Sequence, residues 1–274
     1  MVSVQNVSYF HPNKDLLFDD INFTVNKHDK MALIGNNGIG KSTLLKIISG
    51  ELQPSQGLLR TSSKPYYIPQ IFGQFNQLTI AQALQIEDKL NALHEILAGD
   101  VTETHLALLN DDWTIEERCQ EALTYWKLEG LVLSQKLDTL SGGQKTKVFL
   151  AGISIHQPEI VLLDEPSNHL DISARNLLYD FIKSSTGTLM VVSHDRKLLN
   201  LLYAVYELSK RGVSVYGGNY NFYAAQKLVE SNALNEEVRS KEKMLRKAKE
   251  VERETAERKH KLDARGRKKQ EKTG

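Results

Sequence analysis

The sequence lacks the features of a secreted or membrane-spanning chain. It has one cysteine, Cys119, in 274 residues, which excludes an internal disulfide and fits a reducing compartment. Its apolar runs, such as "IVLL" and "LMVV", are far shorter than the ~20 residues that span a bilayer. The first residues have neither the basic nor the apolar region of a signal peptide. We therefore expect a cytoplasmic protein without a membrane-spanning segment.

The chain also has little net charge, +1 at pH 7, but its charges are unevenly distributed. Residues 226–274 hold sixteen Lys and Arg against ten Asp and Glu, whereas residues 1–225 hold nineteen against twenty-four. The apolar content of 41% is ordinary for a soluble protein with a sizeable core. These numbers predict a mildly acidic body followed by a basic tail.

The tail has a helical pattern. It contains no glycine or proline before Gly266, and Leu234, Val238 and Leu245 keep a heptad-like spacing. We expect one long charged helix of about 38 residues, on the order of 57 Å at 1.5 Å per residue. A basic helix can bind RNA through counterion release. The interleaved acids are equally consistent with a solvated helix of i,i+4 ion pairs, so the tail alone leaves both interpretations open.

Short apolar runs alternate with helical patterns in the body, which predicts an α/β fold with a parallel sheet. "SVQNVSYF" and "INFTV" predict a small antiparallel sheet before it. "KMALIG" leads through a glycine loop into the helical "KSTLLKIISG". Further strands and turns are expected over residues 51–70, and helices over 78–130. "IVLLDE" and "TLMVVSH" predict two buried strands, separated by the helical "ISARNLLYDFIKS".

The glycine loop carries a complete phosphate-binding motif. "GNNGIGKS", from Gly35 to Ser42, follows a predicted strand and opens a predicted helix, as a P-loop requires. The backbone N–H groups of such a loop close around phosphates, and the helix dipole assists them. We expect Lys41 to reach the β- and γ-phosphates of ATP and the Ser42 hydroxyl to bind Mg²⁺. The residues predicted to bind ATP here are Asn36, Asn37, Gly38, Gly40, Lys41, Ser42 and Thr43.

Ionisable side chains follow the two buried strands. Asp164 and Glu165 end "IVLLDE", and His194 follows the next strand. In P-loop NTPases an aspartate at this place holds Mg²⁺ and a further group orients the attacking water. Asp164 is therefore predicted as a metal ligand, Glu165 as the general base, and His194 as a contact of the γ-phosphate or of Glu165. In isolation the Asp-Glu pair could equally begin a solvated turn, and a lone histidine at a strand end is usually structural.

These motifs, in this order over residues 1 to about 225, resemble the ABC (ATP-binding cassette) ATPases. In that family "LSGGQ", residues 140–144, is the signature, and "SNHLD" is the D-loop. Gln70 stands at the Q-loop, and the resemblance implies that it acts in catalysis and in metal binding. It also implies that an upstream aromatic, Tyr9, stacks on adenine. The implied fold is a P-loop NTPase core with a small antiparallel β subdomain and an inserted helical subdomain.

The resemblance implies that two cassettes meet head to tail, with each ATP between one P-loop and the opposite signature. A glycine-rich helix start suits that role, because its N–H groups bind anions. This chain has one motif of each kind, so a second cassette, covalent or in a homodimer, is an expected partner. The residues expected at the shared nucleotide are Ser141, Gly142, Gly143, Gln144 and Asp171.

Within the family, "EPSNHLD", residues 165–171, resembles the ABC-F pattern "EPTNHLD" more than that of membrane transporters. ABC-F proteins lack transmembrane domains and usually hold two cassettes joined by a charged helix. The resemblance implies a cassette over 1–225, with its helical subdomain at about 78–148. Residues 226–274 are expected to be the first part of the linker. It further implies action on the ribosome, its rRNA and tRNA, in translation or antibiotic resistance.

Two other functions are weighed against this one. A nucleotide-binding subunit of a membrane transporter, working as a homodimer, would dock a transmembrane partner near Gln70. The charged tail and "SNHLD" disfavour it. A DNA-associated ABC ATPase would need a long coiled coil between P-loop and signature, and the interval from Lys41 to Leu140 is too short for one.

Overall fold

The computed structural model describes residues 1–270, with side chains for residues 1–250 and for Arg253. The chain divides into one compact unit from Met1 to Asn221 and a second unit that starts at Phe222. The boundary that the sequence places between residues 225 and 226 stays a prediction.

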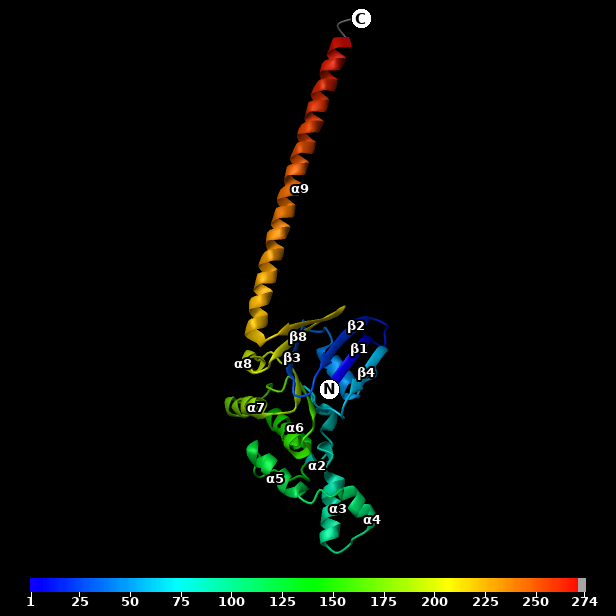
Figure 1. The fold of residues 1–274 in the computed structure, drawn as a ribbon, viewed down its shortest axis with the longest axis vertical. Coiled ribbons are helices and arrows are strands. Elements are labelled where there is room, and N and C mark those ends of the chain that lie inside the picture. Colours follow the sequence, from blue (N-terminus) through cyan, green and yellow to red (C-terminus); the bar gives the residue numbers. More distant parts are fainter. Residues whose placement is uncertain (271–274) are drawn as a thin grey trace. The chain divides into compact units, whose positions relative to one another are not determined.

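The first unit contains two sheets (Figure 1). The smaller sheet is antiparallel, in the order β2 (Leu16–Val25), β1 (Val2–Phe10) and β4 (Gln56–Thr61). Val2 and Val4 of β1 are buried, as the alternation of the sequence predicts for a sheet with one face on the core. The predicted antiparallel subdomain is thus confirmed.

The larger sheet has six strands. Their order is β5 (Tyr66–Ile68), β6 (Ile160–Asp164), β7 (Thr188–Val192), β3 (Lys30–Ile34), β8 (Ala204–Ser209) and β9 (Gly212–Gly217). Neighbours from β5 to β8 are parallel, and β9 pairs with β8 in the antiparallel direction. The α/β fold with a parallel sheet is confirmed. Strands β8 and β9 were not predicted, although β8 buries Val205, Tyr206 and Leu208.

Helix α1 (Lys41–Ser49) follows β3 and packs against β5 and β6. Its buried side chains are Leu44, Leu45, Ile47 and Ile48. Apolar residues at this spacing cover one side of a helix, so burial of that side fixes α1 against the sheet. Gly50 ends the helix with a left-handed φ of 84°, the conformation that glycine adopts at helix ends without strain. The first turn of α1 is thereby held at the carboxyl end of β3.

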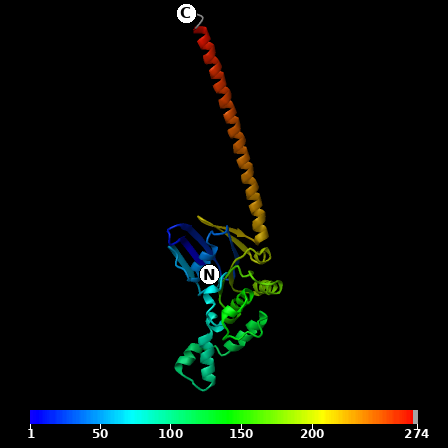
Figure 2. The same cartoon turned by 180° about the vertical axis from the view of Figure 1, so that it is seen from behind.

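The segment between β5 and β6 is mostly helical. It contains α2 (Ile80–Ala83), α3 (Glu87–Leu97), α4 (Glu103–Leu109), α5 (Ile115–Tyr125) and α6 (Gly142–His156), with 3₁₀ turns at Gly73–Phe75 and Leu137–Thr139. Helix α3 packs on α4, and α5 on α6. Figure 1 and Figure 2 show α3 and α4 at the end of this unit that is remote from the small sheet. The segment is helical as predicted, but left-handed residues such as Gln85 and Asn110 divide it.

Two helices separate the later strands. Helix α7 (Ile172–Ser184) lies between β6 and β7, and α8 (Arg196–Leu199) between β7 and β8. An aspartate caps the first turn of each, Asp171 for α7 and Asp195 for α8. Capping aspartates accept hydrogen bonds from N–H groups that have no partner inside the helix. These bonds fix where α7 and α8 begin, after β6 and β7.

The described part of the second unit is helical throughout, and it belongs to helix α9, which spans Tyr220–Gln270. Its 51 residues exceed the predicted length, because the helix starts before residue 226 and continues through Gly266. Glu237 and Lys241 form an i,i+4 ion pair on it, and Leu234 and Val238 are exposed. Among the described residues, no helix combines the length and the apolar character that crossing a membrane requires.

Candidate functional site

A cleft of about 590 Å³ lies where the carboxyl ends of the parallel strands β3, β5, β6 and β7 meet. This edge is where open α/β sheets usually bind ligands. The structure brings together here ten of the residues that the sequence singles out: Asn37, Gly38, Gly40, Lys41, Ser42, Thr43, Gln70, Asp164, Glu165 and His194.

The P-loop forms one wall of the cleft. Gly40 precedes α1 with a left-handed φ of 103°, and a Cβ there would lie 2.8 Å from the Phe18 ring, so only glycine fits. The Lys41 ammonium donates hydrogen bonds to the carbonyls of Gly35 (2.9 Å) and Asn36 (3.1 Å). Burial lowers the pKa of Lys41, and the nearby carboxylates of Glu165 and Asp164 oppose that shift. The loop thus holds a cation beside the first N–H groups of α1, which is an anion-binding arrangement.

Asp164 lies at the end of β6 and is only 2% exposed. Its Oδ2 accepts a hydrogen bond from the Tyr67 hydroxyl at 3.2 Å, and Ser42 lines the same cleft. Its Oδ1 is buried without a hydrogen-bond partner. Burial raises the pKa of Asp164, and the Ser42 and Tyr67 hydroxyls work in the opposite direction. A buried acceptor without a partner is costly, and a cation or a water molecule bound there would satisfy it.

These residues fit a Mg²⁺ ion that is shared with a phosphate. No group of three His, Cys, Asp or Glu side chains in the described part of the chain could hold a metal. Mg²⁺ commonly binds one or two carboxylates, keeps several waters and takes its other ligands from substrate phosphates. Asp164 and Ser42, with Gln70 in the same cleft, provide such a partial ligand set beside the P-loop.

Glu165 follows Asp164 with a left-handed φ of 52°, which turns its side chain into the cleft. Its Oε2 accepts the backbone N–H of His194 at 3.2 Å, and the His194 Nε2 lies 3.4 Å from its Oε1. Burial raises the pKa of Glu165, and the charge of His194 works in the opposite direction. The His194 side chain is 70% exposed, so it can reach a ligand from the rim of the cleft.

The signature residues lie outside this cleft. Ser141 caps α6 and forms a reciprocal capping box with Gln144. Gly142 and Gly143 begin the helix, and a Cβ on Gly143 would lie 2.7 Å from the carbonyl oxygen of His169. Glycine at position 143 is therefore explained by close packing against the backbone of His169, whether or not the residue contacts a nucleotide. The signature and P-loop of one chain are not brought together in one cleft.

Asn36 belongs to the P-loop, but it is not among the residues that line the cleft. Two further predicted residues lie elsewhere. Asp171 is exposed, and its Oδ1 accepts the Ala174 N–H at 2.7 Å as the cap of α7. Tyr9 is half-buried and packs against the core cluster. His11 lines the cleft in its place, with its ring edge-on to Tyr9 at 5.9 Å. Neither predicted role is tested by these positions.

Sequence reasoning missed four residues that line the cleft: His11, Leu17, Asn168 and Val192. Asn168 stands inside the quoted "SNHLD" segment, so its neighbours could have indicated it. His11 lies two residues after Tyr9 and ends a run of three aromatic rings. For Leu17 and Val192 the sequence contains no signal beyond their place near a strand end.

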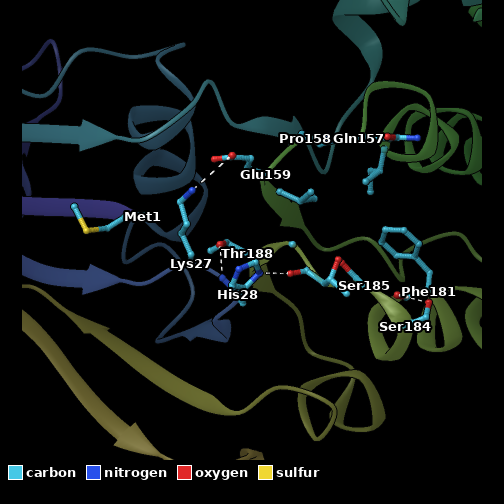
Figure 3. A pocket seen from close by; sticks show the side chains of 14 residues that line it. Met1, Lys27, His28, Gln157, Pro158, Glu159, Phe181, Ser184, Ser185 and Thr188 are labelled. Atoms are coloured by element: carbon cyan, nitrogen blue, oxygen red, sulfur yellow. Dashed lines mark hydrogen bonds and ion pairs between the residues drawn. The ribbon is translucent and has the colours of Figure 1, made fainter.

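A second cavity, of about 470 Å³, lies at the amino ends of β3, β6 and β7 (Figure 3). Its ionisable side chains have partners. The His28 Nδ1 lies 2.6 Å from the Thr186 carbonyl oxygen, and Lys27 lies 3.7 Å from Glu159. No predicted site residue lines this cavity. The cleft at the carboxyl ends of the strands therefore remains the candidate site.

Comparison with known proteins agrees with this geometry. The family model described as ABC transporter matches residues 18–168, a segment that includes the P-loop, Gln70, the signature, Asp164 and Glu165. The chain belongs to the ABC transporter family.

Relatives within this ABC family narrow the assignment. The tylosin resistance ATP-binding protein TlrC of Streptomyces fradiae is 32% identical over 239 residues, covering 78% of this chain and 44% of that protein. ABC transporter F family member 3 of Arabidopsis thaliana is 30% identical over 235 residues, which cover 85% of this chain and 30% of that protein. These relatives confirm the recognition of an ABC-F cassette. The chain spans less than half the length of either protein.

Solved ABC cassettes have the same fold. A dimeric ATP-binding cassette in a post-hydrolysis state, bound to ADP and phosphate, superposes with a TM-score of 0.59 at 22% identity. The match covers 79% of this chain and 98% of that one. At this identity the likeness establishes the fold, and the predicted P-loop NTPase architecture is confirmed.

Proposed function

We propose that this ABC cassette binds ATP with Mg²⁺ and hydrolyses it. The observation that supports the proposal is the single cleft that gathers Lys41, Ser42, Asp164, Glu165 and His194. Lys41 and the N–H groups of the P-loop bind the β- and γ-phosphates, while Ser42 and Asp164, with Gln70, hold the metal. A Mg²⁺ ion held by these residues would neutralise charge that develops on the phosphoryl oxygens.

In this proposal Glu165 is the general base. It takes a proton from the water that attacks the γ-phosphate, and His194 positions Glu165 and contacts the phosphate. A base works best when its pKa lies near the working pH. Burial moves the pKa of Glu165 in that direction, and its two oxygens are held by the backbone and ring of His194.

The signature residues Ser141, Gly142, Gly143 and Gln144 serve a second cassette. Because they lie outside the chain's own cleft, we propose that they bind the nucleotide held by a partner's P-loop, with Asp171 at the same interface. The partner is either a second cassette of one longer polypeptide or the mate of a homodimer. ATP closes this sandwich and hydrolysis opens it.

We further propose that the complete protein acts on the ribosome, in translation or in antibiotic resistance. The ABC-F relatives support this function, and one of them is named a tylosin resistance protein. The basic residues of the tail provide charge that could neutralise rRNA or tRNA phosphates. The alternative, a nucleotide-binding subunit of a membrane transporter, shares the fold of the solved cassettes but not the "SNHLD" resemblance.

Co-sedimentation tests the ribosomal function. We expect the full-length natural polypeptide to pellet with ribosomes more strongly with a non-hydrolysable ATP analogue than with ADP, and less as salt increases. The Lys41→Ala variant is the control, since it should lose the nucleotide dependence. Nucleotide-dependent association with membranes, without binding to ribosomes, would instead support the transporter function.

A second test asks which aromatic ring stacks on the adenine of ATP. His11 lines the cleft, where Tyr9 was expected. Stacking of an aromatic ring on a base contributes about 1–3 kcal/mol. We expect His11→Ala to weaken ATP binding roughly 5- to 100-fold, His11→Phe to retain it, and Tyr9→Leu to change it little. A titration with a fluorescent ATP analogue measures all three. If Tyr9→Leu is the variant that loses affinity, the original prediction for Tyr9 is correct.

A further inference from the structure

We propose that Tyr67 is a positioning residue that fixes the Asp164 carboxylate with one oxygen presented to the metal. This inference rests on the proposed Mg²⁺-dependent nucleotide binding. It concerns a side chain that neither the P-loop nor the strand-end motif contains, and that approaches Asp164 from a different strand.

The register of two strands creates the contact. Strands β5 and β6 are parallel neighbours, with Tyr67 opposite Leu162 and Ile68 opposite Leu163. From this place the Tyr67 side chain reaches towards the end of β6, where its hydroxyl donates to the Asp164 Oδ2 at 3.2 Å. The ring packs against the hydrophobic core cluster. The hydroxyl is therefore held by a packed ring and not by a mobile side chain.

The two oxygens of Asp164 have different environments. Oδ2 has the tyrosine hydroxyl, whereas Oδ1 is buried and has no hydrogen-bond partner within the described residues. A carboxylate without such a bond can rotate about its terminal torsion, which is broad, and exchange its two oxygens. The Tyr67 hydrogen bond removes that freedom. Metal-ligating carboxylates generally depend on such an outer partner for their orientation.

A tyrosine hydroxyl suits this task because it is a neutral donor. A lysine or arginine at the same place would neutralise Asp164 and compete with the cation. A phenol hydroxyl donates a hydrogen bond without carrying a charge, so at this place it orients Asp164 without competing with a cation.

The neighbouring tyrosine provides a matched control. Tyr66 is the preceding residue of the same strand, and side chains alternate between the two faces of a sheet. Its hydroxyl donates to the Phe149 carbonyl at 3.1 Å on α6. Tyr66→Phe therefore removes a hydroxyl of the same kind from the same strand without touching Asp164.

The experiment is a Mg²⁺ titration of nucleotide binding, followed with a fluorescent ATP analogue on the full-length natural polypeptide. In Tyr67→Phe we expect the Mg²⁺ concentration at half-saturation to rise about 10- to 100-fold, the usual effect of removing an outer partner of a metal site. Binding of the analogue in EDTA should be unchanged. Tyr66→Phe should keep the wild-type Mg²⁺ dependence, and Asp164→Asn should lose it.

The outcomes distinguish a failure of the positioning role of Tyr67 from a failure of the proposed function. If Tyr67→Phe and Tyr66→Phe both show the wild-type Mg²⁺ midpoint, the positioning role of Tyr67 is wrong while the proposed function stands. If Tyr67→Phe binds the analogue more weakly to the same extent with Mg²⁺ and with EDTA, the hydroxyl supports the fold and not the metal, and the inference is also overturned. If the wild-type protein shows no Mg²⁺-dependent binding, the proposed function itself fails. Thermal unfolding of both variants monitors folding.

Discussion

Replacing Glu165 by glutamine is expected to reduce ATP turnover by about 10²- to 10⁴-fold, the usual contribution of a general base, while ATP still binds. Glutamine has nearly the same size and keeps an acceptor for the His194 N–H, which lies 3.2 Å from Glu165 Oε2. It cannot accept a proton from water. Release of phosphate and binding of a fluorescent ATP analogue, measured on the same sample of the full-length polypeptide, separate the two effects.

Glu159→Gln is the matched control for this substitution. Glu159 lies beside the second cavity, has an exposed side chain and pairs with Lys27. The same change of charge at this position should leave turnover within about twofold, because surface substitutions rarely have large effects. Undiminished turnover in Glu165→Gln would show that another group is the base.

Glu165→Gln should also change how the stability of the fold depends on pH. The pKa of Glu165 is raised in the folded protein, chiefly by burial. The Glu165 carboxyl group therefore stabilises the folded state when it is protonated, at pH values below its pKa in the unfolded chain. This stabilisation is lost as the pH rises through its pKa in the folded protein. Because glutamine does not ionise, Glu165→Gln should be more stable than the wild type at pH 7. The advantage should shrink towards pH 4, as measured by thermal unfolding at each pH.

The part of the site that sequence could predict is the part defined by local order along the chain. Gly35 to Ser42 join a strand to a helix at fixed spacing, and that spacing alone determines how Lys41 and Ser42 lie. Asp164 and Glu165 end an apolar strand, so their place at the carboxyl edge follows from the parallel sheet. The structure places all four in one cleft.

The remaining part depends on contacts between distant segments. His11 reaches the cleft because the small sheet packs beside the P-loop, which no local pattern reports. The Tyr67 contact with Asp164 depends on the register of β5 against β6, and a shift of one residue would turn the tyrosine to the other face. The role of Tyr9 was implied by the family resemblance and stays a prediction, and its side chain packs against the core cluster.

The elements that were missed have a similar cause. Strand β8 pairs with β3 although the two are far apart along the chain, and β9 is stabilised by pairing with β8. A short apolar run acquires such a partner only in the folded protein. Helix α9 passes through Gly266, although a glycine in a helix costs about 1 kcal/mol relative to alanine, so a single unfavourable residue does not define its end.

Replacing Lys41 by alanine is expected to weaken ATP binding by roughly 3 kcal/mol, or about 100-fold, because truncating one member of a hydrogen-bonded charge pair costs 2–5 kcal/mol. Lys46→Ala is the matched control, since Lys46 is an exposed lysine of the same helix that does not line the cleft. That variant should bind ATP within about threefold of wild type. Isothermal titration with ATP and Mg²⁺ measures both affinities. Equal losses would mean that only the overall positive charge of α1 attracts the nucleotide. A large loss in Lys41→Ala alone would mean that its ammonium, now bonded to the Gly35 and Asn36 carbonyls, contacts the phosphates.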